Sequence, residues 1–218
     1  MGDYANYHVF GFNPEMIKRN NENNNIEVEG VNLKEEFTKR LLETKREGIE
    51  FLITYMDECG FFTAPCSGNY HLAKEGGLLE HSLNVLHNAE KLSATLIGDD
   101  ITDEFKNSIV ICALLHDLGK MGQFEKPNYV DNVLKSGKVS DTKPYTTNPK
   151  LLPVDHEIRS IAIASMFIDL TEEEQFAILY HNGLYGQVGK YALQGKETKL
   201  YMIIHWADMW AARVIEKE

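Results

Sequence analysis

The sequence has 218 residues, of which 43% are hydrophobic and 25% charged, with a formal net charge of −11. These values are typical of a soluble globular protein with a sizeable core, and the charge disfavours a long nucleic acid as ligand because its phosphates would be repelled. No apolar run is long enough to span a membrane and the first 25 residues lack the apolar core of a secretory signal, so we expect a cytoplasmic protein. The three cysteines form no C-x-x-C pair, which disfavours a disulfide framework and a zinc–thiolate site.

Two parts are expected along the chain. Residues 1–30 are polar and rich in asparagine, which is typical of a flexible or loosely docked arm. Residues 31–218 are predicted to form a single compact all-α domain, because hydrophobic residues recur at three- and four-residue spacing. The predicted helices cover residues 33–59, 78–96, 102–116, 155–168, 171–181 and 197–214.

Local signals place several helix ends. Gly60 is expected to end the first helix, Thr102 or a neighbouring Asp to cap the third, and Thr171 with Glu174 to form a capping box. The run 109–115 is apolar all round, which predicts a central position in the core. Residues 119–154 lack helical periodicity and are predicted to form a long irregular insertion, of a kind that often acts as a lid.

Histidine and aspartate residues fall on the core-facing sides of three predicted helices. His81 lies in the first turn of the second helix, and Asp208 lies beside the apolar stripe of the last. His116 and Asp117 are adjacent at the end of the most buried helix. A buried carboxylate needs a cation, and two His with two Asp suit a divalent transition metal. Such a site keeps open positions for substrate and for a metal-activated water as nucleophile.

The same residues lie in motifs that resemble the HD superfamily of metal-dependent phosphohydrolases. The matching segments are GGLLEHS (residues 76–82), LLHDLGK (114–120) and HWADMWA (205–211). In this order they are far more specific than a His-Asp doublet alone, and the resemblance covers about residues 60–215. It implies the helical HD fold and a divalent metal (Mn, Co, Ni, Fe, Mg or Zn), with one or two ions per chain. The implied ligands are His81, His116, Asp117 and Asp208.

Two more histidines, His156 and His181, lie between the doublet and the last aspartate. This order resembles the HD enzymes with two metals, such as the HD-type diadenosine tetraphosphate hydrolases and the cyclic-dinucleotide phosphodiesterases. The resemblance implies a second ion, with Asp117 bridging the pair. The alternatives are that His156 begins a helix or contacts a phosphate, and that His181 is favoured by the dipole at a helix C-terminus.

Three residues are candidates for substrate contacts. Several HD enzymes place a lysine against a substrate phosphate where this chain has Lys120, which implies a catalytic and substrate-binding role beside the catalytic Asp117; the alternative is a solvated lysine. Arg159 shares a helical face with His156 and suits bidentate phosphate binding, unless it forms a surface ion pair. His71, just ahead of the first ligand, is expected to line the entrance or bind the leaving group.

The predicted function is hydrolysis of a phosphoester or phosphoanhydride bond in a nucleotide-like small molecule. No membrane partner is expected, nucleic acid is disfavoured, and a homo-oligomer is compatible with the sequence. One alternative is a 3′-to-5′ exonuclease-like phosphodiesterase that acts on RNA or DNA ends, although no OB-fold module can be recognised. Others are a non-catalytic nucleotide-binding HD domain and a di-iron oxygenase of related fold.

Overall fold

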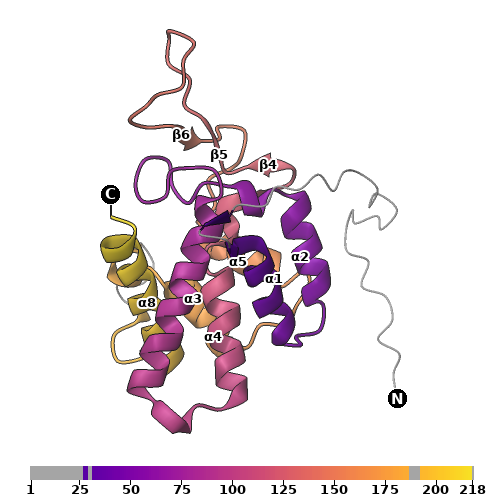
Figure 1. Ribbon diagram of the computed structural model, residues 1–218, viewed down its shortest axis with the longest axis vertical. Helices are drawn as coiled ribbons and strands as arrows, with labels where there is room; N and C mark the ends of the chain where they lie inside the picture. The colour runs from indigo at the N-terminus through magenta and orange to yellow at the C-terminus, as the bar shows by residue number, and fades with distance from the viewer. Residues whose placement is uncertain (1–26, 29–30, 187–191, 218) are drawn as a thin grey trace.

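Helices dominate residues 27–28, 31–186 and 192–217, which the computed structural model describes (Figure 1). The α-helices are α1 (Leu33–Glu43), α2 (Ile49–Glu58), α3 (Gly77–Leu96), α4 (Asp103–Leu115), α5 (His156–Ala164), α6 (Glu172–Tyr180) and α8 (Lys199–Trp210). Short 3-10 turns are η2 (Phe61–Thr63), η3 (Gly98–Asp100), η4 (Leu118–Met121) and η5 (Gly183–Tyr185), and a π-helical turn, η6 (Ala211–Ile215), extends α8. The predicted all-α class is confirmed. None of these helices has the length and apolarity needed to cross a membrane.

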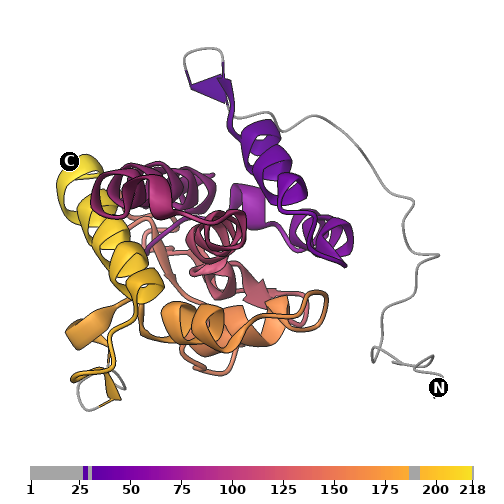
Figure 2. The same ribbon diagram turned by 90° about the horizontal axis from the view of Figure 1, so that it is seen from below.

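The core lies between α3, α4 and α8. α3 packs along both α4 and α8, α8 packs against α6, and α5 packs against η4. Figure 1 shows α3, α4 and α8 beside one another, and Figure 2 shows the same group from below. Every residue of the run 109–115 is buried, as its apolar sequence predicts. The core therefore gathers the helices that carry the predicted metal ligands.

The single helix predicted over residues 33–59 is wrong, because the structure has two helices there. α1 ends at Glu43 and α2 begins at Ile49, and Lys45 (φ 53°) and Gly48 (φ 84°) in the turn have left-handed backbones. A Cβ at Gly48 would lie 1.8 Å from the carbonyl oxygen of Phe167, so this close approach requires glycine. Apolar spacing did not reveal the break, since both helices bury residues in the same core.

The predicted insertion, residues 119–154, has no α-helix. Its strands form two short antiparallel hairpins, β3 (Gly122–Gln123) with β4 (Lys126–Pro127) and β5 (Tyr129–Asp131) with β6 (Tyr145–Thr147). Figure 1 shows this segment projecting beyond one end of the helical core. The N–H of Tyr145 donates to the carbonyl oxygen of Gly68 at 3.2 Å, which ties the insertion to the loop ahead of α3.

The predicted N-terminal arm, residues 1–30, falls outside the described residues except for Glu27 and Val28. These two form strand β1 (Glu27–Val28), which pairs with β2 (Val31–Asn32) just before α1.

The segment after the His-Asp doublet is held against α5 through Gly119. Its N–H donates to Oγ of Ser160 at 2.8 Å, and a Cβ on Gly119 would lie 2.3 Å from the carbonyl oxygen of His156. Glycine is therefore required for η4 to approach α5 this closely. The contact places the first residue of α5, His156, next to the doublet.

The predicted caps of α4 and α6 are confirmed, and the second cap is part of a larger network. Thr102 accepts from the backbone of α4, and Thr171 and Glu174 form a reciprocal capping box. Glu174 also accepts from Arg46, at N···O distances of 2.6 and 3.0 Å, and from Oγ of Ser108 at 2.8 Å. One buried carboxylate thus ties α6 to α4 and to the turn between α1 and α2.

We expect Glu174→Gln to destabilise the protein by about 2 kcal/mol at pH 7, because it removes charge-assisted hydrogen bonds from a buried group. Burial opposes ionisation of Glu174, but hydrogen bonds from Arg46 and Thr171 outweigh it and lower its pKa. A lowered folded-state pKa stabilises the fold above the unfolded pKa of about 4.3, and this contribution is lost as pH falls. Urea unfolding at several pH values should therefore show the two proteins converging below about pH 4.

The control for this experiment is Glu172→Gln, which removes an exposed carboxylate from the same helix turn. A constant difference between wild type and Glu174→Gln at all pH values would contradict the assigned role of the charge.

Candidate metal centre

The six predicted metal ligands converge inside the helical core. His81 lies in the first turns of α3, His116 and Asp117 follow α4, His156 begins α5, His181 follows α6, and Asp208 lies on α8. All are buried except His156, which is half-buried. Residues more than 120 positions apart in the chain therefore meet at one place.

The first group consists of His81, His116, Asp117 and Asp208. Nε2 of His81 lies 3.4 Å from Oδ2 of Asp117 and 3.2 Å from Oδ1 of Asp208. Nε2 of His116 lies 3.4 Å from the same oxygen of Asp117 and 4.0 Å from that of Asp208. The two Nε2 atoms lie 3.3 Å apart. Four ligand atoms thus face one small volume.

Asp117 links this group to a second one that contains His156 and His181. Oδ1 of Asp117 lies 3.1 Å from Nε2 of His156 and 3.5 Å from Nε2 of His181. The oxygen is buried, yet neither imidazole is aligned to donate a hydrogen bond to it within the described part of the chain. The two oxygens of one carboxylate therefore face two different pairs of imidazoles.

Backbone hydrogen bonds fix the tautomer of two of the ligands. Nδ1 of His116 donates to the carbonyl oxygen of Ala113 at 2.9 Å, and Nδ1 of His181 donates to that of Ile178 at 2.8 Å. Since a carbonyl oxygen only accepts, Nε2 of each neutral imidazole carries the lone pair and points inward. Metal-binding histidines are held in this manner in proteins.

Electrostatics at the first group favours a cation. Burial lowers the pKa of His116, so its imidazole is neutral and able to ligate. Burial opposes ionisation of Asp117, but the positive charge of Lys120 outweighs it and holds the pKa of Asp117 well below the usual range. Burial also lowers the pKa of His81, but Cys66 and the neighbouring carboxylates outweigh burial and raise it. A proton is attracted to the place that a divalent ion would take, so metal binding should release protons.

The residues present fit a divalent transition metal. Imidazole nitrogens with carboxylate oxygens are ligands that suit such ions, and the orphaned Oδ1 of Asp117 is a buried acceptor in need of a cation. The predicted ligands His81, His116, Asp117 and Asp208 would hold one ion. Ligand atoms lie within 4.8 Å of one another in His81, His116 and Asp117, in His116, His181 and Asp208, and in Asp117, His156 and His181.

Lys120 lies at this centre. Its Nζ lies 2.6 Å from Oδ2 of Asp117 and 3.8 Å from Sγ of Cys66, and its side chain is only 15% exposed. The alternative of a solvated surface lysine does not apply, because the ammonium group is directed at the carboxylate of Asp117, a predicted metal ligand.

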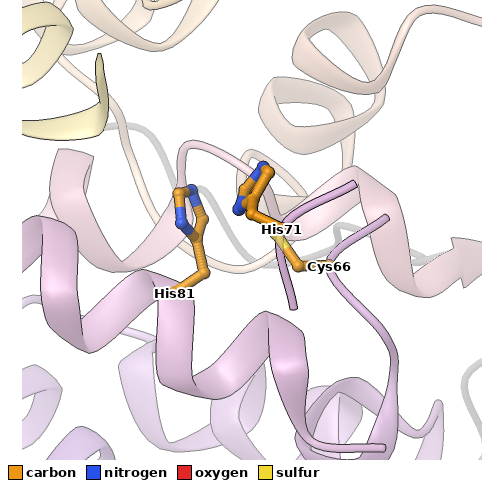
Figure 3. Close-up of side chains that lie close together, drawn as sticks. All are labelled: Cys66, His71 and His81. Atoms are coloured by element: carbon orange, nitrogen blue, oxygen red, sulfur yellow. The ribbon is translucent and has the colours of Figure 1, made fainter. Parts of the chain in front are cut away.

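His71 lies beside the first ligand. The rings of His71 and His81 have centroids 4.9 Å apart, and Figure 3 shows His81 rising from its helix with His71 and Cys66 next to it. Burial lowers the pKa of His71, but contacts with Cys66 and Glu216 outweigh it and raise the pKa to about 9. His71 therefore carries a proton at neutral pH next to the predicted ligands.

Arg159, the third predicted substrate contact, is engaged elsewhere. Its Nη1 donates to Oε1 of Gln123 at 3.0 Å and its Nη2 to the carbonyl oxygen of Leu152 at 2.9 Å. Within the described ranges, Arg159 forms no hydrogen bond or ion pair with the six ligand candidates, and its guanidinium group binds the insertion instead.

Two carboxylates missed by the sequence reasoning face the outer nitrogens of ligands. Oε2 of Glu216 lies 3.0 Å from Nδ1 of His81, and Oε2 of Glu157 lies 3.3 Å from Nδ1 of His156. Glu157 is adjacent to His156 in the chain, so adjacency could have suggested it. Glu216 lies 135 residues from His81, and no sequence signal pointed to it.

Asn182 and Cys66 were also missed. Nδ2 of Asn182 lies 3.1 Å from Nε2 of His181 and 3.4 Å from Nε2 of His156, so a second ion would compete with this amide. Sγ of Cys66 lies within 4.8 Å of ligand nitrogens of His71 and His81, although no C-x-x-C motif marks it.

A cavity of about 250 Å³ opens beside the second group. Its lining includes Asp155, His156, Tyr180, Asn182 and Tyr185. His156 belongs to both the lining and the cluster, so the cavity borders the second group at this residue.

Comparison with known proteins gives one match. A family model described as HD domain matches residues 78–213. No curated protein and no solved structure matches the chain. The matched range contains all six ligand candidates, Lys120 and Arg159, whereas His71 and Glu216 lie outside it.

We expect His156→Ala and His181→Ala each to lower the metal content by about one ion per chain, because each removes a nitrogen from the second group while the first group is left intact. Metal content would be measured by plasma mass spectrometry after loading with Mn²⁺, Co²⁺ or Zn²⁺ and dialysis. His87→Ala, at a half-exposed histidine bound to Glu36, is the control. Unchanged stoichiometry in both variants would leave a centre with one ion.

Proposed function

Since the chain belongs to the HD-domain family, whose members are metal-dependent phosphohydrolases, we propose that it hydrolyses a phosphoester or phosphoanhydride bond of a nucleotide-like small molecule. The observation that carries this proposal is the position of Asp117. One buried carboxylate faces His81 and His116 with one oxygen and His156 and His181 with the other. That arrangement suits a bridging ligand between two divalent ions.

When bound, the ions supply Lewis acidity and lower the pKa of a water molecule so that it can attack phosphorus. The chain's contribution is to hold the ligands in fixed orientation before substrate arrives. The outward hydrogen bonds of His116 and His181 to backbone carbonyls serve this purpose, since they prevent ring rotation.

Two protonated side chains are placed to act on the phosphate. Lys120 carries a positive charge against Oδ2 of Asp117, where it can neutralise charge that develops on the nonbridging oxygens. His71 is held through Nδ1 by Glu216, and its other ring nitrogen would exchange the present contact with Cys66 for a hydrogen bond to the leaving oxygen, which it could also protonate.

A small substrate fits the observations better than a nucleic-acid end. The chain carries a net charge of −11, which opposes binding of a polyanion, and the cavity at the second group is about 250 Å³. Metals that we propose for the centre are Mn²⁺, Co²⁺, Fe²⁺, Ni²⁺, Mg²⁺ or Zn²⁺, with one or two ions per chain.

We expect Asp117→Asn to abolish hydrolysis, with a loss of about 1,000-fold or more, because the bridging charge is removed. Purified protein would be screened against mononucleotides, dinucleotides, cyclic nucleotides and phosphomonoesters with Mn²⁺, Co²⁺ or Mg²⁺, and phosphate or nucleotide release would be measured. Asp131→Asn, an exposed carboxylate in the insertion, is the matched control.

Retained turnover in Asp117→Asn would contradict the assignment. Tight nucleotide binding without turnover in the wild type would favour a non-catalytic nucleotide sensor. Release of single nucleotides from RNA or DNA ends, with no activity on small substrates, would favour the exonuclease-like alternative.

Lys120→Gln should lower kcat/KM by about 100-fold. The substitution removes an ionic interaction with the phosphate that is stronger in the transition state than in the ground state. Metal content should stay unchanged, since Lys120 is not a ligand. Lys126→Gln, at an exposed position of the neighbouring hairpin, serves for comparison. Equal kinetics in wild type and Lys120→Gln would remove Lys120 from the catalytic machinery.

A further inference from the structure

Glu216 occupies an unusual place beside the metal-ligand cluster. It is 6% exposed, and its two carboxylate oxygens accept from three donors. Oε2 lies 2.6 Å from Nδ1 of His71 and 3.0 Å from Nδ1 of His81, and Oε1 accepts from Nδ2 of Asn84 at 2.9 Å. His81 and Asn84 are one turn apart on α3, whereas His71 comes from the preceding loop. One carboxylate thus ties the residue after η6 to two other segments, α3 and the loop ahead of it.

Both carboxylates that flank His81 come from α8 and from the residue that follows its π-helical extension. Asp208 of α8 faces Nε2 at 3.2 Å, and Glu216, eight residues later, faces Nδ1 at 3.0 Å. The imidazole is therefore held between two acidic groups on its opposite nitrogens. Of these, Asp208 faces the metal-ligand cluster and Glu216 faces away from it.

The π-helical turn η6 directs the side chain of Glu216 toward His81. The N–H of Glu216 donates to the carbonyl oxygen of Ala211, five residues earlier, at 2.9 Å. Such a wide turn contains one residue more than an α-helical turn, and each residue of an α-helix advances the side-chain direction by about 100°. Without the additional residue, the side chain at position 216 would leave α8 in a direction about 100° away from the present one.

We propose that Glu216 is a positioning residue of the metal centre, which fixes the ring of His81 through Nδ1 and holds His71 beside it. Because the carboxylate accepts at Nδ1, the neutral imidazole of His81 that would ligate a metal carries its lone pair on Nε2, the atom that faces Asp117 and Asp208. The inference rests on the proposed metal-dependent function, but it concerns metal retention rather than turnover.

A glutamine at position 216 would not replace the carboxylate. An amide offers one acceptor oxygen and one NH₂ donor, whereas His71, His81 and Asn84 present three donors to this side chain. Because both Nδ1 atoms face Oε2, one neutral amide oxygen would have to accept from both imidazoles without the charge of the carboxylate, and the NH₂ group would oppose Nδ2 of Asn84.

The first experiment measures metal affinity of the full chain after removal of bound metal. Glu216→Gln should bind Co²⁺ or Zn²⁺ about 10- to 100-fold more weakly than wild type by titration calorimetry, because loss of an outer partner of a ligand histidine costs this much. The visible spectrum of bound Co²⁺ should change as well. The matched control, Glu104→Gln, removes an exposed carboxylate from the first turn of α4 and should behave as wild type. Affinity within twofold of wild type, with an unchanged Co²⁺ spectrum, would overturn the proposal.

The second experiment tests the π-helical turn with Glu216 still present. Deletion of Ala212 should return the turn to α-helical spacing and give the same loss of affinity as Glu216→Gln. Wild-type affinity in a deletion variant that unfolds cooperatively would show that the turn does not deliver the carboxylate.

A third measurement needs no variant. In wild-type protein loaded with Zn²⁺, long-range proton–nitrogen NMR should find the ring proton of His81 on Nδ1. A proton on Nε2 would overturn the proposal even if Glu216→Gln failed to fold. If the wild type binds metal, Glu216→Gln binds it more weakly and no substrate is hydrolysed, the proposed function fails and this inference stands. If the wild type hydrolyses substrate and Glu216→Gln keeps its metal affinity, only this inference fails.

Discussion

Burial of the Asp117 carboxylate is the constraint on which the rest of this structure depends. The group is 1% exposed, and an isolated charge in such a place costs several kcal/mol unless other groups compensate for it. Lys120 compensates on one oxygen, and imidazoles surround both. Four histidines face this carboxylate. His81 lies on α3 and His156 on α5, whereas His116 and His181 directly follow α4 and α6. The helical core therefore surrounds a charge as well as an apolar interior, and a bound cation would compensate for that charge most directly.

The packing also explains how the predicted ligand histidines keep their ring orientation with few hydrogen bonds to other side chains. His116 and His181 each follow a helix, where the last carbonyl oxygens lack partners within the helix, and each imidazole donates to the carbonyl oxygen three residues earlier. One hydrogen bond therefore gives the carbonyl oxygen at the helix end a donor and fixes the orientation of the imidazole. His81 and His156 lie near the starts of their helices, and there a glutamate carboxylate faces Nδ1 in place of a backbone carbonyl.

How much of this could be read from the sequence depended on whether the signal was local. Helical periodicity, the caps at Thr102 and Thr171, and the motifs around His81, His116 and Asp208 all lie within short segments, and they predicted the fold class and the residues that the structure brings together. The break between α1 and α2 was missed because it depends on a backbone contact with Phe167, far along the chain. Glu216 was missed for a related reason, since a wider helical turn moved it off the expected helical face. The sequence placed Arg159 correctly on a face with His156, but its guanidinium group meets the insertion, whose path no local pattern predicts.

The contact at Gly119 ties the spacing of the two ligand groups to the main chain. Because the backbone of η4 touches the carbonyl oxygen of His156 with no room for a methyl group, the distance between the doublet and α5 is set by van der Waals radii rather than by any ligand. A larger residue at this position would push α5 outward and carry His156 away from Asp117 while every coordinating side chain remained in the sequence. A search for the predicted ligands alone would not detect such a change, so Gly119 is as informative about the geometry of this cluster as the histidines themselves.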